Sequence, residues 1–415
     1  MAAAIAAAAC GSPGPTPSPV ASNQATPSPT AVATPTPTPT PVPTATPLAS
    51  IVAVPTSQLA GPSTAAAHLD DARAKSLQAA LDGVRSSGKY PGASAAVLFP
   101  DGSIWSGVSG TATLSSKMPL TTDTLFSIGS ISKTFVAALI GRLAMDGALG
   151  LDDPLSKYVP DFPNAANITI RQLLDHTSGI DDVFDPNGSL QTAILARRTA
   201  TWTPAQVFAR LLGPRFKPGA NYYYSNTNYI LLGLVAEAAT GQTVAALVRS
   251  DFLQPLAITH TFLQTEEPAP GPAAHGYMAP ASQPVDQTAG TMLPFTAEAT
   301  AVGFAGAYVS TASDLAVWAN ALYGGNVLDQ ATLASMVDIS QTAGLKTKPN
   351  PPYGFGFELS SVAGQLAWGH RGHLDGFWSA MEYLPDSHVT IVVLTNADWA
   401  DPVAASSVLA KIAIS

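Results

Sequence analysis

The octapeptide FSIGSISK, residues 126–133, says more about fold and chemistry than any other part of the chain. Ser130 and Lys133 stand three residues apart in it, at the start of an apolar pattern with helical spacing that runs to Leu143. At positions i and i+3 of a helix, two side chains share a face and can touch. A neutral lysine amine can take the proton of a serine hydroxyl, and unpaired N–H groups at a helix N-terminus can stabilise developing negative charge. The alternative is a serine N-cap with an exposed lysine one turn later, which is the usual meaning of an isolated pair.

The composition is that of a globular chain with few charges. The chain has 415 residues, of which 46% are hydrophobic and 11% charged, enough for one large or two ordinary domains. Its 19 Lys and Arg against 28 Asp and Glu give a formal net charge of −9. The sequence contains no cluster of Lys or Arg, so neither nucleic acid nor an anionic membrane surface is expected as a partner.

The first 62 residues differ from the rest. The single cysteine, Cys10, follows the small residues MAAAIAAAA and precedes a polar tract, which predicts that residues 1–10 are the remnant of a lipoprotein signal with a lipid attached at Cys10. A start codon placed too far downstream explains why the apolar run is short and lacks a preceding basic residue. Residues 11–62 are rich in Pro, Thr, Ser and Ala, which predicts a disordered, polyproline-like linker.

The expected location is therefore extracytoplasmic. The protein would be exported and held at the bacterial membrane by its lipid anchor alone. The alternative is an Ala-rich disordered start with an incidental cysteine.

A folded domain is predicted over residues 67–415. A helical stripe over 69–84 precedes two alternating segments joined by the hairpin signal Asp101-Gly102, and residues 130–300 are mostly helical. The later predicted elements are a helix at 312–323, strands at 353–359, 365–371, 376–384 and 388–395, and a last helix at 404–412. Strands at both ends with helices between them predict the α+β class. The antiparallel sheet would come from 67–129 and 301–415, and a helical subdomain from 130–300.

A second motif, YYSN, occupies residues 223–226. Tyr224 and Asn226 are two residues apart, so an extended segment points both to one side. A phenol can relay a proton, and an amide can hold both a lysine and a substrate carbonyl. The alternative is a turn with a buried tyrosine.

A third motif, GHRGH, occupies residues 369–373 at the end of a predicted strand. Gly372 suits a place where another backbone or a ligand approaches closely, and His370 can supply a polar or cationic group. His370 and His373 face opposite sides of a strand, and no cysteine or acidic partner lies at ligand spacing, so no metal site is predicted. No cofactor is predicted either.

These motifs, in this order, resemble the serine β-lactamase and penicillin-binding superfamily, most closely the class C β-lactamases, serine D-alanyl-D-alanine carboxypeptidases and related esterases. The resemblance covers roughly residues 90–398. The segments that carry the resemblance are LFSIGSISKTF (125–135), ITIRQLLDHTSGI (168–180), FKPGANYYYSNTNYILLG (216–233), GAYVSTASDLAVW (306–318) and YGFGF (353–357). It implies the β-lactamase/transpeptidase-like fold, an antiparallel sheet flanked by helices plus a helical subdomain.

The resemblance also implies roles for the site residues. Ser130 would be the nucleophile, Lys133 its general base, and Tyr224 the residue that passes the proton to the leaving group. Asn226 would hold Lys133 and the substrate. The backbone N–H groups of Ser130 and His373 would form the oxyanion hole.

The sequence departs from the family pattern in the third motif. His370 stands where β-lactamases with a K-T-G motif have lysine, which is more similar to the carboxypeptidases and esterase-like relatives. Arg371 stands where the family usually has Thr or Ser, a hydroxyl that helps to hold the terminal carboxylate of the substrate. Arg371 could bind that carboxylate through a bidentate pair, or strand alternation could turn it away from His370.

Three other residues are interpreted as structural. His176, in DHTSG, is predicted to form hydrogen bonds where a helix meets a loop, and Asp175 and Asp314 are predicted to be cap or surface carboxylates. The G-x-S-x-G motif of α/β-hydrolases is absent from the sequence, which argues against that rival fold.

The resulting hypothesis is a serine hydrolase that forms an acyl-enzyme and acts as a D-alanyl-D-alanine carboxypeptidase-like peptidase. The expected partner is a small peptide, ester or β-lactam substrate, with peptidoglycan as a further candidate. A carboxylesterase or class C-type β-lactamase with the same residues is the alternative among enzymes. A catalytically silent cell-surface binding lipoprotein is the alternative of another class, although such a protein has no need of both Ser130 and Lys133.

Overall fold

The computed structural model describes residues 69–264, 266–288, 296–347 and 349–415. The predicted signal remnant at 1–10, with Cys10, and the predicted linker at 11–62 lie outside the described residues. The predicted domain and subdomain boundaries stay predictions.

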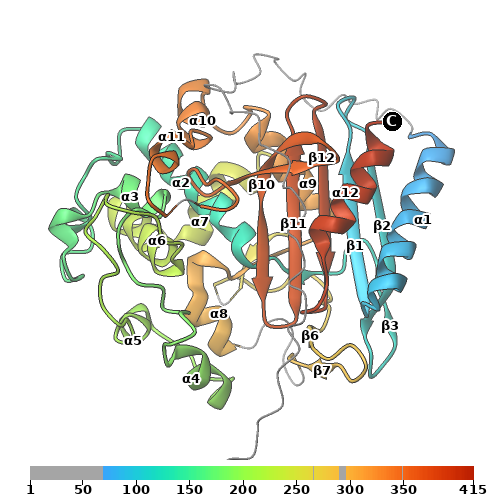
Figure 1. Ribbon diagram of the computed structural model, residues 1–415, viewed down its shortest axis with the longest axis horizontal. Helices are drawn as coiled ribbons and strands as arrows, with labels where there is room; N and C mark the ends of the chain where they lie inside the picture. Colours follow the sequence, from blue (N-terminus) through green and yellow to red (C-terminus); the bar gives the residue numbers. More distant parts are fainter. Residues whose placement is uncertain (1–68, 265, 289–295, 348) are drawn as a thin grey trace, which may run out of the picture. The chain divides into compact units, whose positions relative to one another are not determined.

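The largest element is a seven-stranded antiparallel sheet with the strand order β3-β2-β1-β12-β11-β10-β9 (Figure 1). In that order the strands are Met118–Pro119, Ile104–Thr113, Gly92–Leu98, Val389–Thr395, Phe377–Leu384, Gln365–Leu374 and Glu358–Val362. In the pairing of β1 with β12, Ala93 lies opposite Thr395, so the sheet joins segments from the two ends of the described chain. This confirms the predicted fold class.

Helices cover both faces of the sheet. On one face, α1 (Asp71–Gly88) and α12 (Pro402–Ala413) pack over an aliphatic core that includes Leu77, Val393 and Leu409. On the other face, α9 (Ala312–Tyr323) contacts β1, β11 and β12. Because both faces are covered, every residue of β1 and β12 is buried. The alternation predicted for the first strand therefore does not separate buried from exposed residues.

The helical region lies beside the sheet in Figure 1, and α2 (Ser132–Met145) is at its centre. α2 contacts α6 (Asn226–Thr240), α7 (Val244–Val248) and the 3₁₀ turn η5 (Gly303–Ala305). The other helices are α3 (Ile170–Leu174), α4 (Leu190–Ala196), α5 (Pro204–Phe208), α8 (Thr296–Val302), α10 (Gln330–Met336) and α11 (Ser340–Ala343). α2 is buried nearly all round because helices and the sheet surround it.

Two small sheets complete the described strands. β4 (Phe126–Ser127), β8 (Tyr308–Ser310) and β5 (Phe262–Leu263) form one, and β6 (Tyr277–Met278) and β7 (Val285–Asp286) form the other. The pairing of β4 with β8 fixes the residues just before Ser130, with Phe126 opposite Ser310. Neither sheet was predicted from the sequence, because two-residue strands have no detectable periodicity.

The predicted helix at 312–323 is confirmed as α9, and the last three predicted strands are confirmed as β10, β11 and β12 within a few residues. The predicted strand at 353–359 is wrong, because β9 begins at Glu358. The backbone turns at Gly356, whose φ is +69°, and a Cβ there would lie 2.8 Å from Lys133 O. The YGFGF segment is thus a loop pressed against α2, and only glycine fits at that contact.

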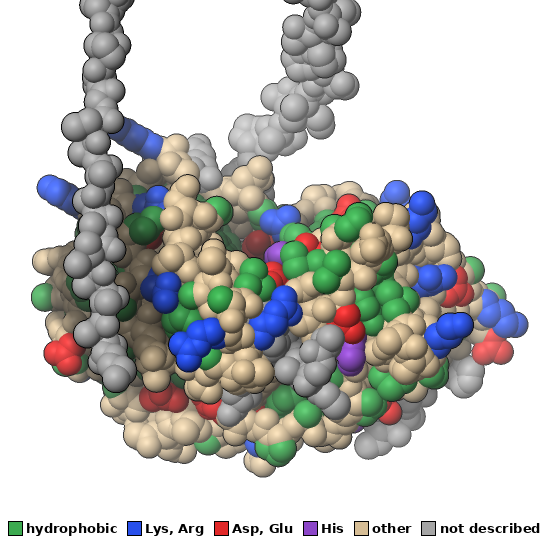
Figure 2. All heavy atoms as spheres, turned by 90° about the horizontal axis from the view of Figure 1, so that it is seen from below, with side chains coloured by type: hydrophobic (Ala, Val, Ile, Leu, Met, Phe, Trp, Pro, Cys, Tyr) green, Lys and Arg blue, Asp and Glu red, His purple; other side chains and the backbone are tan. Residues whose placement is uncertain are grey.

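Among the described residues no single helix is long and apolar enough to cross a bilayer. One pair of helices, Asn226–Thr240 and Val244–Leu253, has the required length and apolar composition only when the two are taken together across an 82° bend. On the face seen in Figure 2, positive and negative side chains are scattered among neutral ones.

Candidate active site

Ser130 lies in a 3₁₀ turn, η1 (Gly129–Ile131), that leads directly into α2. Gly129 has φ +50°, and a Cβ on it would lie 2.5 Å from His373 N of β10. The side chain of Ser132 donates a 2.6 Å hydrogen bond to Gly129 O, which closes the turn. Glycine is required here because the sheet edge and the turn approach each other through backbone atoms. The turn therefore presents Ser130 at the end of a buried helix and beside β10.

Lys133 is fully buried, and its amine is saturated with hydrogen-bond partners. Its Nζ donates to Ser130 Oγ at 2.9 Å, to Asn226 Oδ1 at 2.8 Å and to Ala305 O at 2.8 Å. Burial lowers the pKa of Lys133 from 10.5 to about 7, against the opposing effect of Asp182 and Glu358. A large share of the amine is therefore neutral near pH 7 and can act as a base toward Ser130.

Tyr224 contacts the same serine oxygen from the other side. Its hydroxyl donates to Ser130 Oγ at 2.9 Å. Loss of solvation raises the pKa of Tyr224 well above its ordinary value of 10.0. The phenol therefore keeps its proton at neutral pH, so it is a proton donor while Lys133 is the base.

Asn226 is the first residue of α6, and Asp182 fixes the orientation of its amide. Asn226 Nδ2 donates to Asp182 Oδ2 at 3.1 Å, and its backbone N donates to Asp182 Oδ1 at 3.1 Å. A carboxylate accepts hydrogen bonds only, so it holds the NH₂ end and leaves Oδ1 facing Lys133. Asp182 was not predicted from the sequence, because nothing near it in sequence indicates a contact with Asn226.

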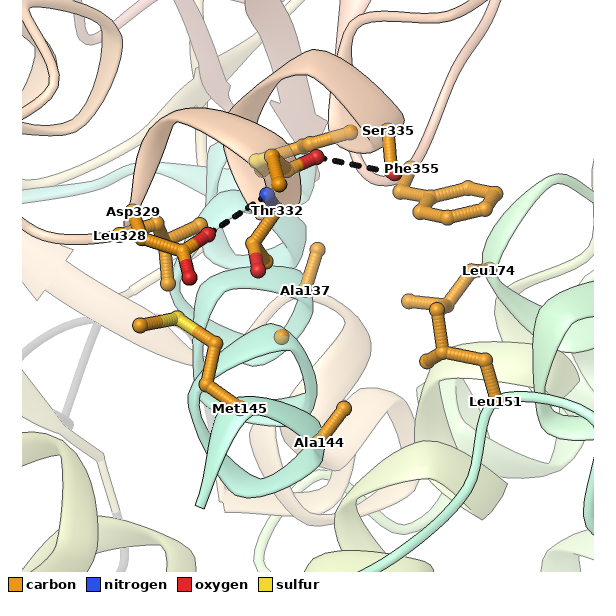
Figure 3. Close-up of a pocket in the computed structure, with 13 residues that line it drawn as sticks. Ala137, Ala144, Met145, Leu151, Leu174, Leu328, Asp329, Thr332, Ser335 and Phe355 are labelled. Carbon is orange, nitrogen blue, oxygen red and sulfur yellow. Dashed lines mark hydrogen bonds between the residues drawn. The ribbon is translucent and has the colours of Figure 1, made fainter. Parts of the chain in front are cut away.

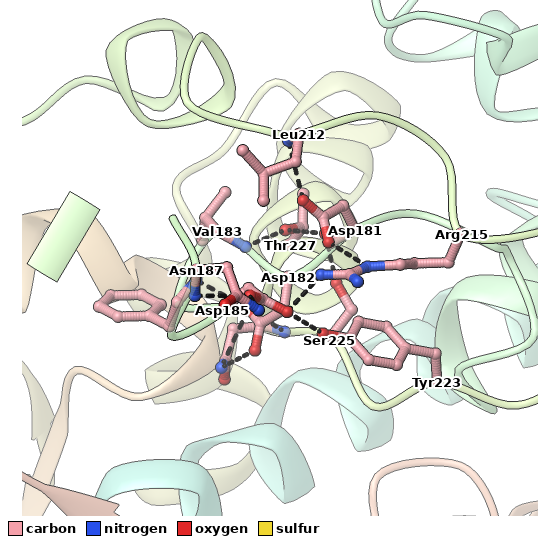
Figure 4. A network of polar contacts seen from close by, with 12 residues as sticks. Asp181, Asp182, Val183, Asp185, Asn187, Leu212, Arg215, Tyr223, Ser225 and Thr227 are labelled. Carbon is pink, nitrogen blue, oxygen red and sulfur yellow. Dashed lines mark hydrogen bonds and ion pairs between the residues drawn. The ribbon is translucent and has the colours of Figure 1, made fainter. Parts of the chain in front are cut away.

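A polar network holds the loop that carries Asp182 against the start of α6 (Figure 4). Thr227 Oγ1 donates to Asp181 O at 2.7 Å, and Val183 N donates to Thr227 Oγ1 at 3.1 Å. Arg215 forms ion pairs with both Asp181 and Asp185. The loop is thereby tied at several points, and Asp182 is held in place for Asn226.

The third motif brings β10 onto the nucleophile turn. A Cβ on Gly372 would lie 1.9 Å from Ile128 O, so only glycine fits there. His373 carries its backbone N beside Gly129, while its ring points away and pairs with Asp398 at 2.5 Å. The backbone N–H of His373 is thus next to the turn that holds Ser130. Its role in an oxyanion hole, together with the N–H of Ser130, stays a prediction.

His370 is buried and takes part in a hydrogen-bonded chain with Tyr353. Its Nδ1 lies 2.5 Å from Arg371 O and its Nε2 lies 3.0 Å from Tyr353 OH. A carbonyl can only accept, so Nδ1 carries the proton and Nε2 accepts from the phenol. Burial lowers the pKa of His370 to about 4. His370 is therefore neutral at pH 7, and the cation that β-lactamases carry in this motif is not supplied by it.

Arg371 does not lie in the catalytic cavity. By strand alternation, Arg371 is on the same face of the sheet as Ala367, which packs in the core under α1 and α12. His370 is on the opposite, catalytic face, together with Trp368 and Leu374. Arg371 Nε pairs with Glu358 Oε2 at 2.7 Å. The alternative that strand alternation turns Arg371 away from His370 describes its position, and binding of a substrate carboxylate by Arg371 stays a prediction.

The residues interpreted as structural are placed as follows. His176 is buried, and its Nδ1 accepts from Ser225 N at 3.2 Å, which confirms a structural hydrogen-bonding role. Asp175 follows α3 and is buried rather than on the surface, where it accepts from Thr177 N at 3.0 Å. Asp314 accepts from His260 N at 2.7 Å. In the described part of the chain, no group of three or more His, Cys, Asp or Glu side chains is placed to hold a metal ion.

Two cavities meet the catalytic residues from different sides. One, of about 520 Å³, is lined by Ser130, Asn226 and His373. The other, of about 420 Å³, is lined by Tyr224, Tyr353 and Glu358. A third cavity, of about 250 Å³, lies between α2 and α10, and Figure 3 shows apolar side chains such as Met145 and Leu174 around it. The nucleophile and its partners do not line this third cavity.

Comparison with known proteins agrees with this geometry. The family model described as Beta-lactamase matches residues 69–411. The chain belongs to the Beta-lactamase family. It is 25% identical over 347 residues to the Beta-lactamase of Escherichia coli, covering 76% of this chain and 86% of that protein. It is 29% identical to Penicillin-binding protein 4 of Amycolatopsis lactamdurans, over 77% of this chain and 84% of the relative. The match spans less than two thirds, 61% and 64%, of two penicillin-binding proteins of Bacillus subtilis.

Solved structures of the same fold include amide-cleaving enzymes. The D-amino acid amidase of Ochrobactrum anthropi is 27% identical with a TM-score of 0.71, covering 82% of this chain and 98% of that one. The D-stereospecific amidohydrolase of a Streptomyces species is 29% identical with a TM-score of 0.67, covering 82% and 97%. Family and geometry together give the chain the β-lactamase and penicillin-binding fold, with a serine, a lysine and a tyrosine in contact at the candidate site.

Proposed function

We propose that the protein is a serine hydrolase that cleaves amide or peptide bonds of D-amino acid substrates through an acyl-enzyme on Ser130. One observation carries the proposal: Ser130 Oγ lies 2.9 Å from both Lys133 Nζ and Tyr224 OH. The base and the proton donor therefore contact the same nucleophile. The similarity to D-amino acid amidase and D-stereospecific amidohydrolase supports the substrate class.

In the proposed first step, neutral Lys133 takes the Ser130 proton as Oγ bonds to the carbonyl carbon. Tyr224 gives its proton to the leaving nitrogen as the C–N bond breaks, and the Lys133 ammonium restores that proton. The net transfer is from the serine to the leaving amine. Water then hydrolyses the ester by the same groups in reverse, which regenerates Ser130.

The carboxypeptidase form of this activity needs a cation for the terminal carboxylate of the leaving D-alanine. Arg371 is engaged with Glu358, which lines the cavity beside Tyr224. We place an amidase ahead of the D-alanyl-D-alanine carboxypeptidase because similar solved structures include a D-amino acid amidase and a D-stereospecific amidohydrolase. Esterase and β-lactamase activity use the same residues, and the substrate comparison below separates them.

The test is covalent labelling followed by turnover. A fluorescent fluorophosphonate should label wild-type protein and Ser127→Ala, a matched control whose buried hydroxyl has no partner among the described residues, and should not label Ser130→Ala. Turnover of D-phenylalaninamide should exceed that of a D-Ala-D-Ala peptide, p-nitrophenyl acetate and a chromogenic cephalosporin. Absence of labelling in the wild type would instead support a silent binding protein.

A further inference from the structure

Of the two cavities that meet the catalytic residues, one is lined by Ser130 and the other by Tyr224, and in the proposed function they would hold the two halves of a substrate. Tyr224, which faces the leaving group in the proposed function, lines the 420 Å³ cavity. Ser130, Asn226 and His373 line the 520 Å³ cavity, so the acyl half of the substrate lies there. The chemistry of this second cavity therefore decides which acyl groups are accepted.

The acyl-side cavity is acidic. Its described lining contains three carboxyl groups, Asp185, Glu298 and Asp375, and no lysine or arginine. Asp185 is already compensated, because Arg215 forms an ion pair with it and Tyr223 OH donates to it at 2.8 Å. Within the described ranges, Glu298 and Asp375 have no such ion pair. Asp375 Oδ2 accepts from Gln191 Nε2 at 3.0 Å, so two carboxyls without an ion pair remain in the cavity, and one of them has a neutral partner.

Glu298 is an unusual residue to bury without compensation. It is 2% exposed, its Oε1 accepts from Asp375 N at 3.2 Å, and its Oε2 has no hydrogen-bond partner among the described residues. A buried acceptor without a partner is unfavourable, so such a group points to a missing ligand. Burial, followed by the charge of Asp375, raises the pKa of Glu298 to about 8. Arg198 lowers the pKa of both carboxyls, but by less than burial raises it, so neither charge is fully compensated.

Glu298 and Asp375 lie on segments that run next to the catalytic residues. Asp375 follows His373 by two residues at the end of β10, and Glu298 lies in α8, which leads into η5 and Ala305. Ala305 O is itself an acceptor for Lys133 Nζ at 2.8 Å. Both carboxyls are therefore carried by segments that also touch the catalytic residues.

We propose that Glu298 and Asp375 form a subsite for a primary ammonium group on the acyl residue of the substrate. The enzyme would accordingly act on D-amino acid amides and peptides with a free amino terminus. An ammonium carries three donors and one positive charge, which satisfies the unpartnered Oε2 and compensates both carboxyls. This inference rests on the proposed function, because it assigns the acyl side from the role of Tyr224.

The first test compares ligands on the wild-type protein. D-phenylalaninamide should slow fluorophosphonate labelling at a concentration at least tenfold lower than 3-phenylpropanamide, which has the same skeleton without the amino group. The same preference should appear in kcat/KM for the two p-nitroanilides at pH 7. Equal protection by the two amides would overturn the subsite while leaving the proposed function intact, whereas failure of labelling would remove the proposed function itself.

The second test uses charge-removing variants. Glu298→Gln and Asp375→Asn should each lower the ratio of kcat/KM for the amino over the desamino p-nitroanilide by at least tenfold, mainly through KM for the amino substrate. Glu382→Gln is the matched control, because Glu382 is also buried with an unpartnered Oε2 but lies on β11 and does not line the cavity. A ratio that stays at the wild-type value in both cavity variants would exclude the proposed subsite.

Discussion

The two sides of the seven-stranded sheet bury an ionisable group in different ways. On the catalytic side, Lys133 is fully buried and donates to three acceptors. On the side covered by α1 and α12, Glu382 is 3% exposed and its Oε2 has no partner among the described residues. Burial lowers the pKa of Lys133 to about 7 and raises that of Glu382 to about 8. Burial thus moves both groups toward neutrality, but the lysine amine has three hydrogen-bond partners, whereas Glu382 Oε2 has none among the described residues.

Removal of the lysine should have the largest effect. Lys133→Met keeps the length and apolar character of the buried chain but removes the base, so the acylation rate should fall by about 10³-fold or more. The rate of fluorophosphonate labelling measures this directly. The far-UV circular dichroism spectrum should be unchanged, and labelling at near-wild-type rate would show that another group activates Ser130.

The pH dependence should show the titration of the same lysine. Lys133 has its pKa lowered to about 7, so its reactive neutral form decreases about tenfold per pH unit below that value. The value of kcat/KM for a substrate without ionisable groups should rise with pH and level off above about 7. Of the groups around the site, His370 and His176 have lowered pKa values and stay neutral, and Tyr224 has a raised one and stays protonated. The negative charges of Asp182 and Glu358 raise the pKa of Lys133. Asp182→Asn should therefore shift the midpoint of the pH–rate profile to lower pH.

On the other side of the sheet, replacement of Glu382 should change stability and leave turnover unaffected. The folded pKa of Glu382, about 8, is above the ordinary 4.5, so the folded state binds the extra proton between these values. Its contribution to stability is therefore complete below about pH 4.5 and is lost as the pH rises through 8. Glu382→Gln should stabilise the protein at pH 9 by an amount on the order of a few kcal/mol. Urea unfolding at pH 5 and pH 9 measures this, and an unchanged pH dependence would show that Glu382 is ionised in the fold.

Glu298 titrates in the same range and provides a check on that measurement. Its pKa is also raised to about 8, so the slope of stability against pH should be reduced, not abolished, in Glu382→Gln.

The sequence predicted the catalytic centre better than its surroundings. Ser130 with Lys133 and Tyr224 with Asn226 lie in short motifs whose spacing on a helix or an extended segment fixes their relative positions. The structure brings these side chains together as expected. The strands with continuous apolar runs were also predicted, since β11 and β12 are buried on both sides.

The missed residues share a physical reason. Asp182, Glu298 and Tyr353 act through contacts with residues far away in the sequence, and their local sequence gives no sign of this. The strand predicted from Tyr353 onward was wrong because the approach of Gly356 to α2 overrides the local β propensity. Long-range contacts such as these follow from the packed fold rather than from local pattern.

Arg371 should give the smallest effect of all, because it belongs to the Glu382 side of the sheet. Its side chain is 40% exposed, and its guanidinium pairs with Glu358, an interaction worth at most about 1 kcal/mol. Arg371→Gln should therefore leave kcat/KM for D-phenylalaninamide within about threefold of wild type. A D-Ala-D-Ala peptide and its C-terminal amide provide the matched pair of substrates, since they differ in the carboxylate that an arginine would bind. If Arg371→Gln lowered kcat/KM for the peptide but not for its amide, Arg371 would have to reach the catalytic side. Arg371 would then not belong to the Glu382 side of the sheet alone.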